Sequence, residues 1–210
     1  MDKRYQIYTD YLLEVNSHTN LTTITDPEEI KIKHFEDSLS VLPYIKEGNK
    51  VLDIGAGAGF PGIPLAMEKD IDLTLIDSVN KKVNFMNEVI EKIGLDNARA
   101  IHVRAEDYAK EARESFDLVV SRAVANMSTL SEYCIPFLKV GGIFIALKGP
   151  MADVELDEAT NAIKILGGRV KNIDRFSLEG NERVNIVIEK DHSTKKTYPR
   201  GKNLPKKNPL

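Results

Sequence analysis

Residues 51–62 read Val51-Leu52-Asp53-Ile54-Gly55-Ala56-Gly57-Ala58-Gly59-Phe60-Pro61-Gly62. A short apolar strand over 51–54 therefore runs straight into three glycines at every second position, and then into a helix expected over about 61–68. Glycine adopts positive φ without strain and lets a ligand approach the backbone closely. A plain tight turn needs only one or two glycines. The stretch predicts a ligand-binding loop at the carboxyl end of a strand in a doubly wound α/β fold.

Two classes of cofactor fit these glycines. Residues 57–62 match the dinucleotide pattern Gly-x-Gly-x-x-Gly, which indicates a nicotinamide-dependent oxidoreductase. The other frame starts at Asp53 and continues through Gly55, Gly57 and Gly59, and it is similar to the first motif of class I methyltransferases, which bind S-adenosylmethionine. A carboxylate suits the sulfonium and amino end of that cofactor, whereas it repels a pyrophosphate. Asp53 therefore favours S-adenosylmethionine.

Strands and helices alternate on the C-terminal side of this loop. Further strands are expected over 73–76, 98–103, 116–120, 143–147, 170–177 and 183–189, and further helices over 79–93, 127–138 and 153–166, with glycines at 94, 141–142 and 167–168 ending the helices. The alternation predicts a parallel sheet covered on both faces, and the last two strands predict an antiparallel hairpin. We expect an α/β protein with the Rossmann-like fold of class I S-adenosylmethionine-dependent methyltransferases. Its seven-stranded sheet should be mostly parallel with an antiparallel edge.

The chain divides into three expected segments. Residues 1–46 read as an N-terminal helical cap, in which one helix breaks at 16–20 and a second starts after Asp26, a good N-cap, with Pro27 in its first turn. Residues 47–190 form the expected methyltransferase domain. Residues 191–210 form a basic C-terminal tail.

The formal net charge of −3 conceals an asymmetry along the chain. Residues 191–210 carry six Lys or Arg and one Asp, so the tail is +5 and the remaining 190 residues are −8. A tail of this kind is commonly a disordered, solubilising terminus. It can instead be an arm that contacts phosphate. Composition leaves both interpretations open.

The composition excludes several classes of protein. An apolar share of 42% is too high for a disordered chain, and the apolar runs are far shorter than the ~20 residues of a membrane span. The single cysteine, Cys134, excludes an intramolecular disulfide, and residues 1–5 lack the features of a signal peptide. We expect a cytoplasmic, monomeric protein with no membrane partner. The four histidines show no ligand spacing, so we expect no metal site.

Later positions fit the adenosine half of the cofactor. Asp77 ends the second strand, where a carboxylate can accept both hydroxyls of a ribose or cap the following helix. Ala105 and Glu106 follow the third strand, where this fold holds the adenine ring. A backbone or side-chain group there can bond the adenine edge.

Motifs of other methyltransferase classes are absent. After the fourth strand, residues 121–126 lack the Asn/Asp-Pro-Pro-aromatic loop that usually accompanies methylation of an exocyclic amine. Cys134 lies on an amphipathic helix and is expected in the core rather than as a nucleophile. A loop without acid, base or thiol suits a target that is already a nucleophile. Nitrogen 7 of guanine is such a target, since its attack needs alignment and electrostatics rather than proton abstraction.

Three further stretches carry a specific resemblance. They are residues 20–22 with 33–38, Ser121-Arg122-Ala123, and Tyr198-Pro199-Arg200 with 206–210. Together with 55–62 they resemble the RsmG family, also called the glucose-inhibited division protein B family, over essentially the whole chain. The resemblance implies a methyltransferase that modifies guanine N7 in bacterial small-subunit (16S) ribosomal RNA, with that RNA or a pre-30S particle as its partner.

The resemblance also implies roles for individual residues. The family's cofactor contacts fall on Gly55, Phe60, Ala105, Glu106 and Arg122, in addition to Asp53, Gly57, Gly59 and Asp77 named above. Arg122 is also the expected catalytic residue, because its charge can hold the methionine carboxylate, an RNA phosphate or the guanine carbonyl. The residues expected to bind RNA are Lys33, His34, Lys148, Arg200, Lys206 and Lys207. The alternatives are a nicotinamide-dependent oxidoreductase and a non-catalytic RNA-binding or assembly protein that retains the cofactor pocket.

Overall fold

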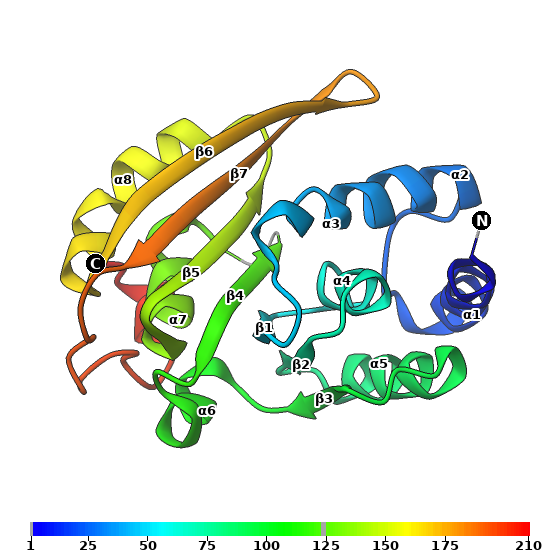
Figure 1. Ribbon diagram of the computed structural model, residues 1–210, viewed down its shortest axis with the longest axis horizontal. Coiled ribbons are helices and arrows are strands. Elements are labelled where there is room, and N and C mark those ends of the chain that lie inside the picture. Colours follow the sequence, from blue (N-terminus) through cyan, green and yellow to red (C-terminus); the bar gives the residue numbers. More distant parts are fainter. Residues whose placement is uncertain (1, 123–124) are drawn as a thin grey trace.

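A seven-stranded sheet forms the centre of the computed structural model, which describes residues 2–122 and 125–210 (Figure 1). In chain order the strands are β1 (Lys50–Ile54), β2 (Asp72–Asp77), β3 (Ala98–His102), β4 (Phe116–Arg122), β5 (Leu138–Lys148), β6 (Gly168–Leu178) and β7 (Asn181–Lys190). Their spatial order is β3-β2-β1-β4-β5-β7-β6. Neighbours among β1 to β5 pair in parallel, and β7 runs antiparallel between β5 and β6. The predicted α/β class, mostly parallel sheet and antiparallel edge are confirmed.

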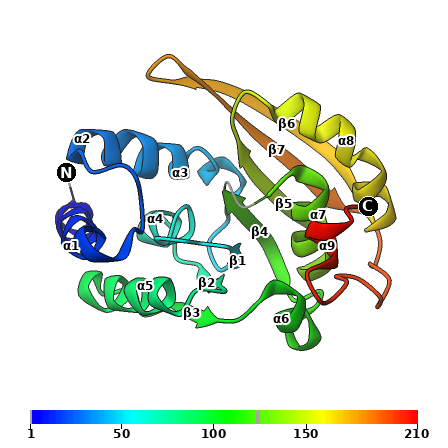
Figure 2. The ribbon, with the colours of Figure 1, turned by 180° about the vertical axis from the view of Figure 1, so that it is seen from behind.

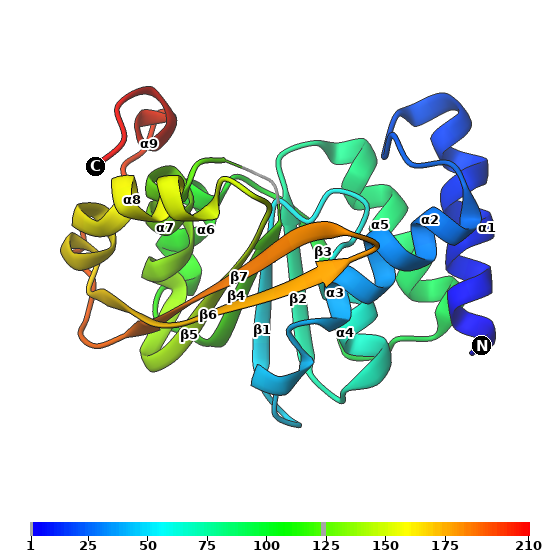
Figure 3. The same ribbon diagram turned by 90° about the horizontal axis from the view of Figure 1, so that it is seen from above.

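Helices cover both faces of the sheet (Figure 3). One face carries α4 (Gly62–Glu68) and α5 (Asn80–Ile93), and the other carries α6 (Ala105–Ala112), α7 (Met127–Cys134) and α8 (Ala152–Ile165). Successive side chains of a strand point to opposite faces. In β1, Val51 accordingly joins the core of α4 and α5, whereas Leu52 joins the core of α7 and α8. The short apolar run that opens the glycine loop is therefore buried on both sides.

The N-terminal helices extend the layer of α4 and α5. α1 (Lys3–Thr19) packs on α5. A second, continuous helical run consists of α2 (Pro27–Ile30), the π-helical turn η1 (Lys31–Glu36) and α3 (Asp37–Leu39), and it precedes the 3-10 turn η2 (Leu42–Tyr44). Asp26 caps this run as predicted, because its carboxylate accepts the N–H of Glu29 at 3.0 Å. Tyr8 and Leu12 of α1 are fully buried in the same core as α4 and α5.

The first helix ends at the last residue of the predicted break over 16–20, so it is longer than the start of that stretch suggested. α1 continues to Thr19 and ends at Asn20, whose φ of 52° lies in the left-handed region. The side-chain oxygen of Asn16 accepts the N–H groups of Leu21 at 2.7 Å and Thr22 at 2.9 Å. Asn16 therefore turns the chain back after the helix instead of interrupting it.

The predicted helix over 127–138 is too long, and the glycines at 141–142 do not end it. α7 stops at Cys134, and β5 starts directly after the 3-10 turn η3 (Ile135–Phe137). Pro136 has no backbone N–H to donate, so it cannot continue the helical hydrogen-bond pattern. Gly141, with φ of 85°, lies inside β5, where the pairing with β4 changes register after Phe116.

The C-terminal tail packs against the rest of the molecule (Figure 2). Thr194 and Pro205 are buried, and α9 (Leu204–Lys207) rests on α7. The hydroxyl of Thr129 on α7 donates to the carbonyl of Pro205 at 2.9 Å. The tail is thus a docked segment rather than a free terminus. Within the described residues, no helix combines the length and the apolar character needed to cross a bilayer.

Candidate functional site

A cavity of about 700 Å³ opens at the carboxyl ends of β1, β2 and β4. The strand order reverses between β1 and β4, and doubly wound folds bind ligands at such a switch point. The cofactor candidates on its wall are Gly55, Gly57, Phe60, Asp77, Ala105, Glu106 and Arg122, and the RNA candidates on its wall are His34 and Lys206. One cavity thus brings together the glycine loop, three strand ends, the N-terminal helices and the tail.

The glycine loop is fastened to the end of β2. Gly55 and Gly57 adopt φ of 69° and 62°, which favours glycine. One carboxylate oxygen of Asp77 accepts the N–H of Gly57 at 3.1 Å, and the other accepts the N–H of Val79, just before α5, at 2.9 Å. The helix-capping role of Asp77 is therefore present. The same carboxylate lies on the cavity wall, where it can also receive ribose hydroxyls.

Ala105 and Glu106 begin α6 on another wall of the cavity. Glu106 is buried, and one of its carboxylate oxygens accepts a hydrogen bond from Nε of Arg104 at 3.0 Å. N–H groups in the first turn of a helix lack an acceptor within the helix. This corner therefore offers both donors and a carboxylate, which are the groups that an adenine edge needs.

Asp53 lies behind the glycine loop and does not line the cavity. Its Oδ2 accepts the N–H of Gly62 at 2.8 Å, while its Oδ1 has no hydrogen-bond partner among the described residues. A Cβ added at Gly62 would lie 2.9 Å from Oδ2, so glycine is required there for the loop to close over the carboxylate. Burial raises the pKa of Asp53 to about 7. A buried carboxyl oxygen without a donor, directly behind the glycine loop, fits a cofactor with a cationic end.

The raised pKa of Asp53 predicts a specific pH dependence of stability in the cofactor-free protein. The carboxyl stays protonated in the folded state up to a pH of about 7, whereas in the unfolded chain it ionises near 3.8, so its contribution to stability falls as the pH rises between these values. Because asparagine does not ionise, Asp53→Asn should not show this fall in stability with rising pH. The free energy of unfolding of Asp53→Asn, relative to wild type, should rise by about 3–4 kcal/mol between pH 4 and pH 8 in urea titrations. The control Asp96→Asn, at an exposed carboxylate, should follow wild type, and parallel curves for both variants would contradict the prediction.

Phe60 is stacked with two other rings. Its ring lies parallel to that of Tyr8, with centroids 5.1 Å apart, and is also stacked with the ring of His34, with centroids 4.6 Å apart. The hydroxyl of Tyr8 donates to the carbonyl of Ala58 in the glycine loop. Burial, helped by the charge of Arg122, lowers the pKa of His34 to about 4, so this ring is neutral. Nothing in the sequence around Tyr8 signals this contact with the glycine loop, which lies 50 positions further along the chain.

Arg122 ends β4 and is held by three acceptors from the N-terminal helices. Its guanidinium donates to the carbonyl of Lys33 at 3.1 Å, to Oδ2 of Asp37 at 3.2 Å and to Nδ1 of His34 at 3.1 Å. A guanidinium only donates, so Nδ1 of His34 accepts and its Nε2–H donates to the hydroxyl of Thr22 at 2.9 Å. Asp37 was part of the family motif but had no predicted role. The structure gives it one, since it anchors the arginine at the cavity.

A comparison with models of protein families shows to which family the chain belongs. The model described as GidB, rRNA small subunit methyltransferase G, matches residues 1–185. The chain belongs to this methyltransferase G family. Ribosomal RNA small subunit methyltransferase G from Clostridium perfringens (strain 13 / Type A) is 48% identical over 215 residues, which cover 99% of this chain and 90% of the relative. The protein of the same name from Clostridium beijerinckii is 49% identical over 218 residues. This alignment covers 99% of this chain and 91% of the relative.

Solved structures outside the methyltransferase G family share the fold. YcgJ from Bacillus subtilis superposes with a TM-score of 0.61 at 15% identity, over 76% of this chain and 100% of the other. TYW2 from P. horikoshii, in complex with MeSAdo, gives a TM-score of 0.62 at 17% identity, over 74% of this chain and 62% of the other. The class I methyltransferase fold expected from the glycine loop is confirmed.

The residues expected to bind RNA fall into two groups in the structure: some present their charge at the surface, and others are held in ion pairs. Lys206 lies on the cavity wall, and Lys207 is exposed beside it on α9. Lys33 is half-buried and pairs with Glu29. Lys148 and Arg200 instead form ion pairs in which they are largely withdrawn from solvent: Nζ of Lys148 lies 2.7 Å from Glu155 and also donates to the carbonyl of Ala125, and Arg200 pairs with Glu132. In this conformation neither presents its charge to RNA. Ala123, the third residue of the motif with Ser121 and Arg122, lies outside the described residues.

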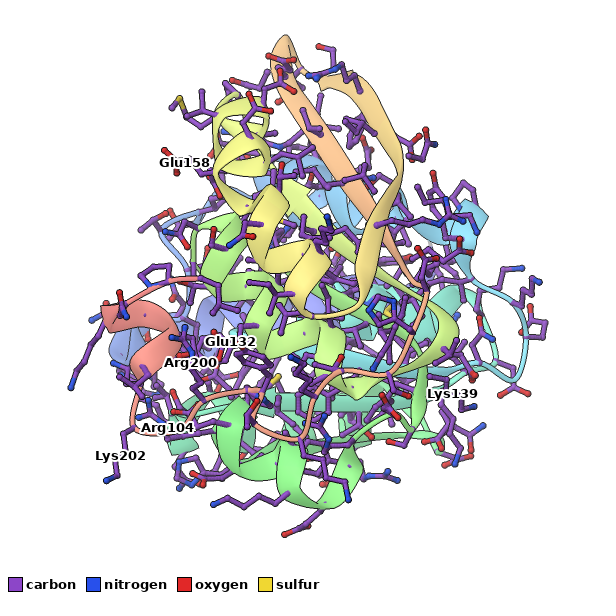
Figure 4. All side chains as sticks on the ribbon, turned by 90° about the vertical axis from the view of Figure 1, so that its left-hand side faces the viewer. Arg104, Glu132, Lys139, Glu158, Arg200 and Lys202 are labelled. Atoms are coloured by element: carbon purple, nitrogen blue, oxygen red, sulfur yellow. The ribbon has the colours of Figure 1, made fainter. Side chains whose placement is uncertain are left out.

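Arg200 is the main anchor of the tail in this methyltransferase G structure (Figure 4). Its guanidinium donates to both carboxylate oxygens of Glu132, at 2.9 Å and 2.7 Å, and its backbone N–H donates to Oε1 at 2.7 Å. Glu132 is fully buried on α7. Further along, Asn203 accepts a hydrogen bond from the hydroxyl of Tyr133 at 3.3 Å. α7 therefore holds the tail so that Asn203 and Lys206 complete the wall of the cavity.

Arg200→Ala should undock the tail. It leaves the buried carboxylate of Glu132 without its counter-charge, which costs roughly 3–5 kcal/mol for a buried pair. We expect a fall of this size in the free energy of unfolding and rapid tryptic cleavage within residues 191–203. The control Arg175→Ala breaks an exposed pair with Asp153 and should cost about 0–1 kcal/mol. Equal protease resistance in wild type and Arg200→Ala would show that the ion pair is not the anchor.

Proposed function

We propose that this protein transfers a methyl group from S-adenosylmethionine to nitrogen 7 of a guanine in small-subunit ribosomal RNA. The observation that carries the proposal is the cavity at the switch point, where the Asp77-bound glycine loop and the clamped Arg122 face the same space. Membership of the methyltransferase G family and the class I fold support it. The dinucleotide alternative is less favoured because the Asp77 carboxylate lies on the cavity wall and binds the glycine loop, where its negative charge repels a pyrophosphate.

The residues of the cavity would hold the cofactor along its length. Ala105 and Glu106 would receive the adenine edge and Asp77 the ribose hydroxyls, and the glycine loop would lie along the methionine portion. Asp53, behind the loop, would offset the positive charge. When bound, the cofactor supplies an electrophilic methyl group on its sulfonium. His34 stays neutral at physiological pH and adds no second positive charge near it.

The chain needs to align the guanine rather than to activate it. Nitrogen 7 of guanine carries an in-plane lone pair and no proton, so no general base has to remove one. The guanine carbonyl oxygen lies next to this nitrogen and accepts hydrogen bonds from arginine. Arg122, fixed by Asp37, His34 and the carbonyl of Lys33, is placed to donate to that oxygen and so to orient the base. This role makes Arg122 the proposed catalytic residue.

We also propose the setting in which the reaction occurs. The partner is small-subunit rRNA, either naked or in a pre-30S particle, and the protein acts as a monomer in the cytoplasm. Lys206 on the cavity wall and the exposed Lys207 beside it place positive charge at and outside the cavity. Such charge can contact RNA phosphates, which supports an RNA partner.

The deciding experiment is methylation in vitro with labelled S-adenosylmethionine on small-subunit particles and on naked rRNA, followed by nucleoside digestion. We expect labelled 7-methylguanosine. Tight binding of NADH with no response to S-adenosylmethionine would replace the proposal with an oxidoreductase. Unchanged 7-methylguanosine in rRNA from cells lacking the protein would indicate a non-catalytic RNA-binding protein.

A further inference from the structure

A second cavity, of about 690 Å³, lies beside the first. Its walls are α6 on one side and tail residues 196–203 on the other. Arg104, Glu106 and Asn203 line both cavities, so the two are contiguous. A ligand chain that leaves the first cavity across Asn203 enters the second.

Cations dominate this second cavity. Five line it, namely Arg104, Lys110, Arg113, Lys196 and Lys202, against two carboxylates, Glu106 and Asp107. Both carboxylates already have partners, because Glu106 pairs with Arg104 at 3.0 Å and Asp107 with Lys110 at 2.7 Å. Three positive charges therefore have no compensating acid on the wall. Residues 1–190 carry a net charge of −8, so a cavity with surplus positive charge is unusual on this protein.

One of the surplus cations fixes the shape of the cavity. Arg113 donates to the carbonyls of Thr194, at 2.8 Å, and Tyr198, which ties the tail to the end of α6. The side chains of Lys196 and Lys202 are exposed, and among the ion pairs of residues 2–122 and 125–210 neither takes part. Arg113 thus builds the wall, and the two lysines present charge to whatever enters.

The backbone turns sharply at the junction of the two cavities. Lys202 and Asn203 are consecutive residues with φ of 57° and 60°. Asparagine tolerates this left-handed conformation, but lysine adopts it at a cost of about 1 kcal/mol relative to glycine. The two residues form the turn that precedes α9, at the rim shared by the two cavities.

We propose that the second cavity binds a phosphodiester group of the RNA strand that carries the target guanine. The inference rests on the proposed function and deepens it. The strand would pass from the first cavity, past Lys206 and Asn203, to the ammonium groups of Lys196 and Lys202. The five cations of this cavity are not among the residues individually expected to bind RNA, although Lys196 and Lys202 belong to the basic tail for which contact with phosphate is one of the two interpretations. Figure 4 shows Arg104 and Lys202 on one side of the view, with Lys139 on the opposite side.

The test compares the double variant Lys196→Ala/Lys202→Gly with wild type and with Lys139→Ala. Glycine relieves the strained φ at position 202, so the double variant should fold at least as well as wild type by thermal unfolding. Filter binding of a labelled small-subunit rRNA transcript, at several salt concentrations, should show a Kd about 10-fold weaker at 0.1 M salt. The slope of log affinity against log salt should fall in magnitude by about 1.4–1.8, which corresponds to two lost phosphate contacts. Affinity for S-adenosylmethionine should be unchanged.

The controls distinguish a failure of the phosphate site from a failure of the proposed function. Lys139→Ala removes an exposed cation that pairs with Asp117 on the far side of this face, and it should bind RNA as wild type does. If wild type methylates rRNA but the double variant keeps both its Kd and its salt slope, the second cavity is not a phosphate site. If wild type neither binds nor methylates rRNA, the proposed function itself fails.

Discussion

Arg122→Ala is expected to lower kcat/KM for rRNA methylation by about 10²–10³-fold, the size of effect seen when one fixed hydrogen-bond donor is removed from an active site. The reason is the three-point support of its guanidinium by Lys33, His34 and Asp37, which fixes the donor at the cavity before any ligand binds. Arg122→Lys keeps the charge but not the planar fork, so it should still lose at least about 10-fold. Steady-state methylation with a labelled cofactor measures both variants.

The support of Arg122 can be tested apart from the residue itself. Asp37 is buried and forms two ion pairs. Its Oδ2 lies 3.2 Å from the guanidinium of Arg122, and its Oδ1 lies 3.3 Å from Nε of Arg183 on β7. Asp37→Asn leaves Arg122 in place but weakens its orientation, so kcat should fall about 10-fold while the Kd for S-adenosylmethionine stays within about 2-fold. The control Arg99→Ala, at an exposed arginine on β3 3.8 Å from Asp72, should leave activity unchanged. If Arg122→Ala kept full methylation activity, Arg122 would have no role in catalysis.

Gly59→Ala should be the most disruptive substitution in the glycine loop. Gly59 has φ of 91°, and a Cβ there would lie 2.5 Å from Cδ1 of Ile63 and 2.6 Å from the hydroxyl of Tyr8. Left-handed strain of about 1 kcal/mol adds to overpacking of about 1–3 kcal/mol. Because the displaced Tyr8 stacks on Phe60, the same change should also abolish measurable binding of S-adenosylmethionine. Urea unfolding and calorimetric titration give the two readouts.

A second glycine isolates the contribution of the clash. Gly48 also has positive φ, 76°, but a Cβ there meets nothing within 4 Å. Gly48→Ala should therefore show only the backbone cost of about 1 kcal/mol and keep cofactor binding. If both variants lose the same stability, the packing of Gly59 against Tyr8 and Ile63 contributes nothing.

Local patterns in the sequence were sufficient for the fold. The glycine loop, the alternation of strands and helices, and the final hairpin depend on neighbouring residues, and each appears as predicted. The misplaced start of β5 depends on pairing instead: residues 138–142 become strand because β4 offers an edge across a change of register. α6 was missed because it is only eight residues long and Ala109 is its one buried apolar residue.

The candidate site depends more on contacts between distant parts of the chain. Glu132 reads as an ordinary acid on an amphipathic helix, and its burial arises only because Arg200, 68 positions later, folds onto it. Tyr8 and Asp37 are likewise defined by partners far along the sequence, namely the glycine loop and Arg122. The assignments of Asp53, Asp77 and Arg122 remain predictions, each now with a defined position and a measurable consequence.

The docking of the tail has a practical consequence for labelling the protein. Leu210 packs against the core beneath α7 and α8, and the carbonyl of Asn208 accepts a hydrogen bond from Arg200. A purification tag or fluorophore fused after residue 210 would extend from the segment that walls both cavities. The N-terminal end of α1 lies at the opposite end of the molecule (Figure 1), which makes it the attachment point that leaves those walls undisturbed.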